Sequence, residues 1–168
     1  VDQKDMYNGA PNQYDWELKG KRELIVPYNA YKLHDESVRP NDVIRPNHIN
    51  QDLTRYELHR VWVVEAKRRT GISHIYDRRV YYIDEDSWQI LATEEYNEAG
   101  ELWRVSEAHN IVYYSVPVFW TTMEMTYDLK AQRYYIDGLD DGYPAYNFEP
   151  GYRGNEFTAA AARRAARR

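Results

Sequence analysis

The chain has 168 residues and no cysteine, a length that suits one domain with a buried core that needs no disulfides. The missing cysteines exclude a disulfide framework, a thiol nucleophile and a cysteine-ligated zinc site. The formal net charge of -5 disfavours a nucleic-acid partner, and no apolar run is long enough to span a membrane.

The first elements predicted are two short strands, Tyr14–Leu18 and Arg22–Tyr28, joined by a turn at 19–21. A loop-like stretch, His34–Asp52, follows and contains two prolines and little periodicity. A structureless stretch of this length is uncommon inside a compact domain. We therefore expect it to be either a crossing segment or a lid over a cavity.

The strongest strand pattern is Leu53–Lys67, whose ends alternate between apolar and polar residues as a half-solvated strand does. Its centre, Val61–Val64, is apolar at every position. Such a run is typical of a strand that is covered on both faces. We expect that cover to come from a segment outside this chain, because the chain offers a single short helix.

A series of hairpins is predicted from there onward, since turn residues recur at the spacing of an antiparallel meander. Tyrosine is unusually frequent, with 17 residues, and suits wide, half-buried sheet faces. The fold class is therefore mainly β, a single meander domain over residues 1–168. The later strands are expected at His74–Ile83, Trp88–Tyr96, Glu101–Tyr114, Val118–Leu129 and Arg133–Asp137.

The tail is predicted to be a loop over residues 138–154 followed by one short helix from Ala159 to Arg168. Thr158 is a good N-cap, and alanine is the best helix former. The late arginines suit the negative end of a helix. They could also touch acidic lipid or nucleic acid, but a solvated basic terminus is the simpler interpretation.

Arg60 is a candidate binding residue because it shares a strand face with apolar Leu58, Trp62 and Val64. A charge there needs a partner or a path to water. It either forms a structural ion pair or recognises an anionic head group. The partners expected from neighbouring strands are Glu94, Glu107 and Glu124.

Two further pairs leave alternatives open. Met123 and Met125 lie side by side on the apolar face of one strand, where they either pack in the core or line a pliable cavity. Glu57 and His59 share a strand face and form either a solvated pair or an acid–base pair. The histidines show no metal-binding spacing, so no metal and no cofactor are expected.

Several motifs resemble a family of Gram-negative envelope proteins of unknown function, often labelled outer-membrane lipoprotein-sorting proteins. The resemblance spans nearly the whole chain, and its most specific part is the run from Arg55 to Ala66. The other matching motifs include 6–9, 47–50, 84–88, 100–104 and the closing Phe157-Thr158 with its Ala/Arg run.

The resemblance implies a periplasmic location and a longer parent protein of which this chain is the C-terminal part. It also implies a fold similar to the carriers LolA and LolB, a curved antiparallel half-barrel closed over an apolar cavity by helices. Those carriers hold acyl chains and are not enzymes, and the family provides no catalytic residues. A fragment of such a half-barrel is expected to expose an edge strand and a wide apolar face.

The leading hypothesis is therefore a periplasmic, non-enzymatic binder of a hydrophobic ligand such as a lipid or an acylated protein. The expected contacts are Arg60, Trp62, Trp88, Met123 and Met125. A structural or interaction module is the second hypothesis, with other envelope proteins or the remainder of the parent protein as partners. An enzyme that uses Glu57 and His59 is the third.

Overall fold

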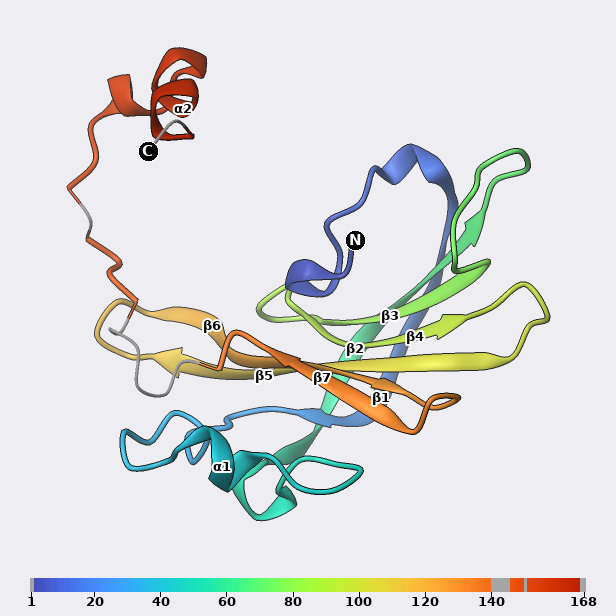
Figure 1. Cartoon of the computed structure of the whole chain (residues 1–168), viewed down its shortest axis with the longest axis horizontal. Coiled ribbons are helices and arrows are strands. Elements are labelled where there is room, and N and C mark those ends of the chain that lie inside the picture. The colour runs from blue at the N-terminus through green and yellow to red at the C-terminus, as the bar shows by residue number, and fades with distance from the viewer. Residues whose placement is uncertain (1, 140–145, 150, 167–168) are drawn as a thin grey trace.

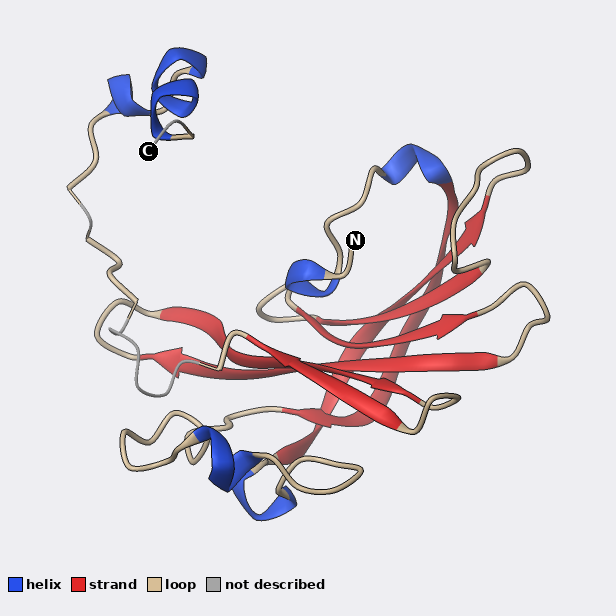
Figure 2. Ribbon diagram, in the orientation of Figure 1, coloured by secondary structure: helices blue, strands red, loops and turns tan. Residues whose placement is uncertain are grey.

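The computed structural model describes residues 2–139, 146–149 and 151–166, and an antiparallel sheet dominates it (Figures 1 and 2). The sheet has seven strands in the order of the sequence, so each strand pairs with the next. The predicted meander is confirmed. The strands are β1 (Tyr14–Pro27), β2 (Tyr56–Arg68), β3 (Arg78–Asp84), β4 (Ile90–Tyr96), β5 (Leu102–Tyr113), β6 (Val118–Asp128) and β7 (Arg133–Asp137).

The helices are short: α1 (Pro40–Val43), α2 (Ala159–Ala165) and single 3-10 turns at 4–6, 11–13, 51–53 and 154–156. The predicted cap of the C-terminal helix is confirmed, because Thr158 Oγ1 accepts a hydrogen bond of 3.2 Å from the Ala161 N–H. The predicted end at Arg168 and part of the predicted 138–154 loop lie outside the described residues. No helix in the described ranges is long and apolar enough to cross a membrane.

The prediction of two strands before Tyr28 was wrong, because β1 is one continuous strand of 14 residues. Both halves of β1 pair with β2, and a β-bulge between Leu18 and Gly20 accommodates one extra residue in β1. Gly20 has φ +96°, a conformation that glycine adopts without steric cost. The Lys19-Gly20-Lys21 sequence therefore bends a strand where a hairpin turn was expected.

One side of the sheet, which we call the covered face, carries Val63 of β2 and Met125 of β6. Strand pairing connects them through a single row across the sheet. The stretch from Ala30 to Ile49, which includes α1, packs directly on Met123 and Met125. The loop-like stretch is therefore the crossing segment of the two alternatives. It covers the sheet, and core side chains pack beneath it.

The opposite side, which we call the open face, carries the N-terminal segment, residues 2–13. Figure 1 shows this segment and the stretch around α1 on opposite sides of the sheet. Tyr7 of the segment packs against a buried cluster of Tyr14, Ala66 and Tyr81, and Val64 lies at the edge of the same cluster. Tertiary packing therefore places residues 2–13 on the open face and residues 30–49 on the covered face.

The centre of β2 is covered on both sides, as predicted, but the cover comes from this chain itself. Val61 and Val63 are buried on the covered face. On the open face Val64 lies under the N-terminal segment. The Lys21 ammonium lies 4.5 Å from the centre of the Trp62 ring. On the covered face, the expectation that a segment outside the chain must supply this cover was wrong, whereas on the open face Trp62 and Val64 are half-buried.

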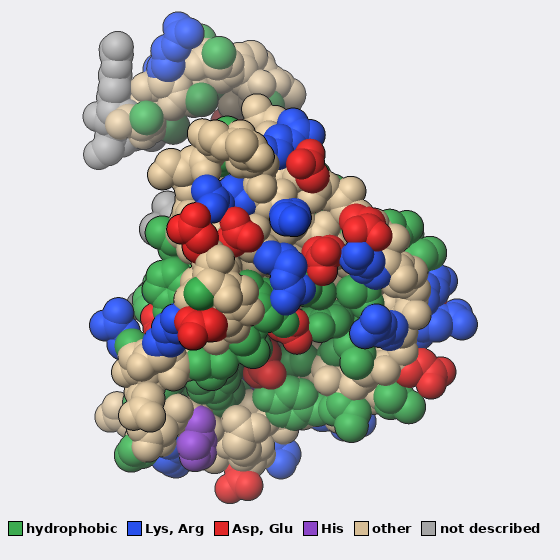
Figure 3. Space-filling view, turned by 90° about the vertical axis from the view of Figure 1, so that its right-hand side faces the viewer, with side chains coloured by type: hydrophobic (Ala, Val, Ile, Leu, Met, Phe, Trp, Pro, Cys, Tyr) green, Lys and Arg blue, Asp and Glu red, His purple; other side chains and the backbone are tan. Residues whose placement is uncertain are grey.

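Apolar side chains remain exposed elsewhere on the open face of β1 and β2. Leu18, Ile25 and Leu58 are 61%, 74% and 66% exposed. Strand β1 also forms one edge of the sheet, as expected. On one side of the molecule, hydrophobic side chains gather next to closely mixed basic and acidic ones (Figure 3). Apolar and charged side chains are therefore interspersed on the side of the molecule seen in Figure 3.

Candidate functional site

A row of alternating charges crosses the open face from β3 to β7. Each residue lies directly opposite the next in the strand pairing, and opposite charges in such positions attract. Every member shares one face because residues paired across antiparallel strands point the same way. The row consists of Arg79, Glu95, Arg104, Asp128 and Arg133.

The β3–β4 end of the row is sealed beneath the N-terminal segment. Arg79 is 1% exposed and its guanidinium donates a hydrogen bond of 2.7 Å to Oδ1 of Asp2. Burial alone would raise the pKa of Asp2, but the hydrogen bond and charge of Arg79 hold it below its usual value. Burial raises the pKa of Glu95, which accepts a hydrogen bond of 2.8 Å from Thr93. This end is structural.

The β5–β7 end of the row is open to a cleft of about 630 Å³, a volume typical of ligand sites. The Arg104 guanidinium on the floor of the cleft donates hydrogen bonds of 3.1 Å to Asp128 and 2.7 Å to the Tyr76 hydroxyl, which hold it in place. The cleft is lined by Gln3, Lys4, Arg104, Glu124, Thr126, Asp128, Arg133, Tyr134, Tyr135 and Asp137.

Glu124 lies in this cleft where the N-terminal segment meets the sheet. Burial, with a contribution from the nearby Asp5 charge, raises the pKa of Glu124 to about 7. The backbone of Met6 and Asp5 partly offsets this rise in the pKa. Asp5 and Met6 have φ of 52° and 63°, a left-handed conformation that is uncommon outside glycine. The cleft therefore holds a carboxyl group whose charge changes near neutral pH.

The structure places Arg60 on the open face, but its partner is Glu85 in the β3–β4 turn, at 2.8 Å to both carboxylate oxygens. The predicted partners were wrong. Glu94 and Glu107 accept tyrosine hydroxyls instead, and Glu124 lies in the cleft. Pairing of Val61 with Asp84 brings Glu85 beside Arg60, a register that the sequence did not reveal.

The five predicted ligand contacts are not brought together. Trp62 shares the open face with Arg60, and Trp88 is 69% exposed beyond the end of β3. Met123 and Met125 are buried on the covered face, which is the core-packing alternative. A ligand role for these residues stays a prediction.

Glu57 and His59 do meet, with 3.4 Å between Oε2 and Nε2. Hydrogen bonding from Asn29, the largest influence, lowers the pKa of Glu57 and so favours its ionised form. The ring of Tyr28 stacks on that of His59 at 3.7 Å between centroids. In the described residues no group of three His, Asp or Glu side chains is placed to hold a metal ion.

The sequence interpretation missed the cleft. One signal was available: Asp128 and Arg133 flank the predicted turn at 130–132 and so pair across it. The other members of the row could be found only from the exact register of consecutive strands, because bulges shift the pairing of β3 with β4 and of β4 with β5.

Comparison with known proteins identifies relatives along almost the entire chain. Residues 1–163 match the family described as "Protein of unknown function (DUF1329)". The Uncharacterized protein PA3922 of Pseudomonas aeruginosa is 48% identical over 163 residues, which cover 96% of this chain and 36% of that protein.

Two solved structures are similar in fold. A DUF1329 family protein from Desulfovibrio piger has a TM-score of 0.50 and 13% identity, covering 94% of this chain and 52% of that one. A domain described as an outer membrane lipoprotein-sorting protein, from Vibrio parahaemolyticus, has a TM-score of 0.49 and 12% identity, covering 92% and 50%. The chain therefore spans about a third of the length of PA3922 and about half of each solved chain.

Proposed function

The chain belongs to the DUF1329 family, and on that premise we propose that it is part of a periplasmic, non-enzymatic carrier or binding protein for a hydrophobic ligand, such as a lipid or an acylated protein. One observation carries the proposal. Large apolar side chains stand exposed on the open face of β1 and β2, at Leu18, Ile25 and Leu58.

Exposed apolar groups on a sheet face favour a ligand because covering them releases free energy. Burial yields roughly 25 cal/mol per Å² of apolar surface, and contiguous apolar patches commonly mark binding sites. Leu58 lies directly opposite Ile25 in the strand pairing, so these two side chains form one contact surface. An acyl chain lying along β1 and β2 would cover it.

The rest of the open face suits an amphiphile. The cleft on β5–β7 offers charged and hydroxyl side chains on the same face as the apolar pair. A ligand with an apolar tail and a polar head could therefore use both ends of one sheet face. The periplasmic location rests on the resemblance of the sequence to envelope proteins and belongs to the proposal.

A second candidate is an interaction module of the cell envelope, in which the sheet docks on another protein. It is favoured by the packed state of the covered face, where Met123 and Met125 lie beneath residues of the α1 stretch. It is also favoured by β1, a long edge strand that pairs with β2 alone among the strands that the structure describes. Edge strands provide backbone groups with which another chain can pair.

The experiment is lipid capture by the purified full-length protein. Mass spectrometry of organic extracts should reveal a co-purifying lipid, and a fluorescent fatty acid should be taken up. Leu58→Asp is expected to reduce uptake, whereas Ile75→Asp is the matched control, because Ile75 is also exposed, at 53%, but lies in the loop between β2 and β3. Absence of both lipid and uptake would contradict the carrier proposal.

A Glu57→Ala/His59→Ala double variant separates binding from catalysis. The carrier proposal expects normal lipid uptake by this variant, because both residues lie on the covered face, away from the apolar pair. Loss of uptake in a variant that remains folded by circular dichroism would favour a functional role for Glu57 and His59.

A further inference from the structure

We propose that the cleft on β5–β7 binds a zwitterionic head group, with its anionic part near Arg133 and its ammonium near Asp137. This inference rests on the proposed function, because it names the class of amphiphile that the open face would carry. Opposite charges lie at the two ends of the cleft.

One end of the cleft is cationic. A second pocket adjoins the cleft there and shares Arg104, Asp128 and Arg133 with it. With Lys130, the charged side chains of this pocket are three basic residues against one acid. Arg104 is paired with Asp128, and Lys130 with Glu101. Arg133 makes no ion pair with any residue that the structure describes. Its exposed guanidinium is therefore available to an anion.

The other end is acidic. A third pocket adjoins the cleft there and shares Lys4, Glu124 and Asp137 with it. With Asp5, the charged side chains of this pocket are three acids against one basic residue, Lys4. Trp120 and Tyr146 line the same end, with 6.4 Å between their ring centroids. Aromatic faces and carboxylates together attract ammonium groups. This end therefore has the chemistry to hold the cationic part of a ligand.

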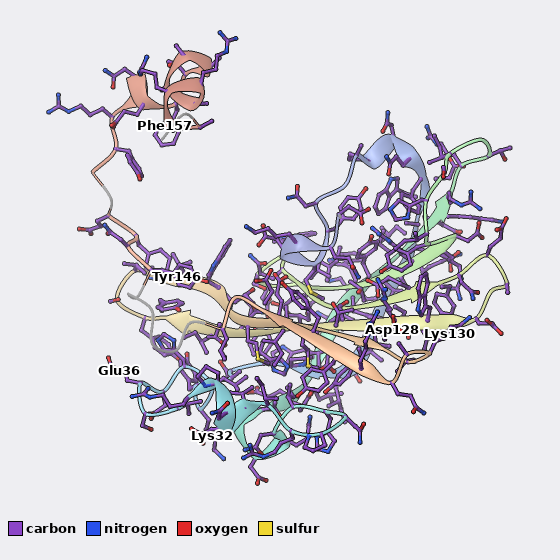
Figure 4. The ribbon with its side chains drawn as sticks, viewed as in Figure 1. Lys32, Glu36, Asp128, Lys130, Tyr146 and Phe157 are labelled. Carbon is purple, nitrogen blue, oxygen red and sulfur yellow. The ribbon has the colours of Figure 1, made fainter. Side chains whose placement is uncertain are left out.

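The two ends are connected along one strand. Arg133, Tyr135 and Asp137 alternate along β7 and face the cleft. At roughly 3.3 Å per residue the backbones of Arg133 and Asp137 lie about 13 Å apart, and the long arginine side chain closes part of that distance. Figure 4 shows Asp128 and Lys130 at one end of the β6–β7 hairpin and Tyr146 toward the other.

Hydroxyl groups fill the middle of the cleft. Thr126 and Tyr135 lie opposite one another in the strand pairing, and both line the cleft. Hydroxyls donate to phosphate or carboxylate oxygens without adding charge. The order along the cleft is thus guanidinium, hydroxyls and carboxylates, which complements a phosphate linked to an ammonium better than it does a simple fatty acid.

The test uses head groups without acyl chains, so that it reports on the cleft alone. Glycerophosphoethanolamine, glycerol 3-phosphate and ethanolamine are titrated separately into the full-length protein and followed by calorimetry or NMR. Glycerophosphoethanolamine should bind about tenfold more tightly than either fragment, which corresponds to one added charge contact. Equal affinity for glycerol 3-phosphate would overturn the zwitterion assignment in favour of a plain anion.

Charge-removing variants locate the two contacts. Arg133→Gln should weaken both phosphate-containing probes about tenfold. Asp137→Asn should weaken glycerophosphoethanolamine but leave glycerol 3-phosphate unchanged or tighter. Lys67→Gln and Asp52→Asn are matched controls, since both residues are exposed and lie outside the cleft. Equal binding by all four variants would overturn the proposal.

The readouts separate this inference from the proposed function. The carrier proposal stands and the cleft assignment fails if lipids co-purify and Leu58→Asp impairs uptake, but the affinity for the head-group probes is unchanged in Arg133→Gln and Asp137→Asn. If glycerophosphoethanolamine binds with the expected variant pattern but no acyl ligand is captured, the cleft assignment stands and the carrier proposal fails.

Discussion

Arg79 of β3 and Asp2 of the N-terminal segment form a buried ion pair of 2.7 Å between residues 77 positions apart. Three tyrosine rings surround the guanidinium, the nearest being Tyr76 at 4.6 Å from ring centre to Cζ. The pair holds the N-terminal segment on the open face, where Gln3 and Lys4 of that segment line the cleft.

Asp2→Asn is expected to destabilise the protein by about 3–5 kcal/mol, because it leaves the buried Arg79 charge without its partner. Chemical denaturation followed by circular dichroism measures the change. Asp15→Asn is the control, since it removes an ion pair of the same length with Arg69. This pair is on the surface, with the Asp15 side chain 70% exposed and the Arg69 side chain 50% exposed. The control should cost at most about 1 kcal/mol, and equal losses would contradict the structural role of Asp2.

Glu124→Gln should change how stability depends on pH. The pKa of Glu124 is about 7 in the folded protein, against an ordinary value of 4.5. The folded state therefore binds more protons than the unfolded chain between these values, and this group's contribution to stability falls as pH rises through that window. The glutamine variant should lose this dependence and be more stable than the parent at pH 8, by an amount on the order of 1 kcal/mol after solvent screening.

Thermal melts at several pH values between 5 and 8 measure this effect. Glu101→Gln provides a control with no pH dependence of its own in this range, because hydrogen bonding from Lys130 lowers the pKa of Glu101. The stability that Glu101 contributes is present above its unfolded pKa and is lost only in acid. Parallel pH profiles for the parent and Glu124→Gln would contradict the assignment for Glu124.

Met125→Ala tests whether the methionines are core. Met125 is 1% exposed and packs against the α1 stretch, so its truncation should cost about 2–5 kcal/mol. Leu129→Ala is the control, because Leu129 is 48% exposed and should change stability little. A small loss of stability accompanied by reduced lipid uptake would instead favour the cavity-lining alternative for Met125.

Gly20→Ala tests the bulge in β1. An added Cβ would meet no atom within 4 Å, so any cost comes from the backbone conformation at φ +96°. We expect a loss of about 1–2 kcal/mol, because non-glycine residues adopt this region at a steric cost. Gly154→Ala is the control, since Gly154 also has open space but no positive φ. Equal stability of both variants would argue against a required bulge.

Sequence alone determined the strands from β2 onward and their order. The alternation in β2, the turn residues between later strands and the Thr158 cap depend on neighbours along the chain, and β7 was predicted to the residue. The resemblance carried by the Arg55–Ala66 run indicated the correct family.

Only the tertiary structure decided which distant residues meet. Bulges at Gly20 and between Tyr82 and Ile83 shift the strand register, and each shift changes which side chains face one another across the sheet. For that reason the charge row and the partner of Arg60 could not be deduced from local patterns. The pairing of Asp2 with Arg79 likewise joins residues far apart in the sequence and follows only from folding in three dimensions. It places the N-terminal segment over one end of the charge row and leaves the cleft at the other.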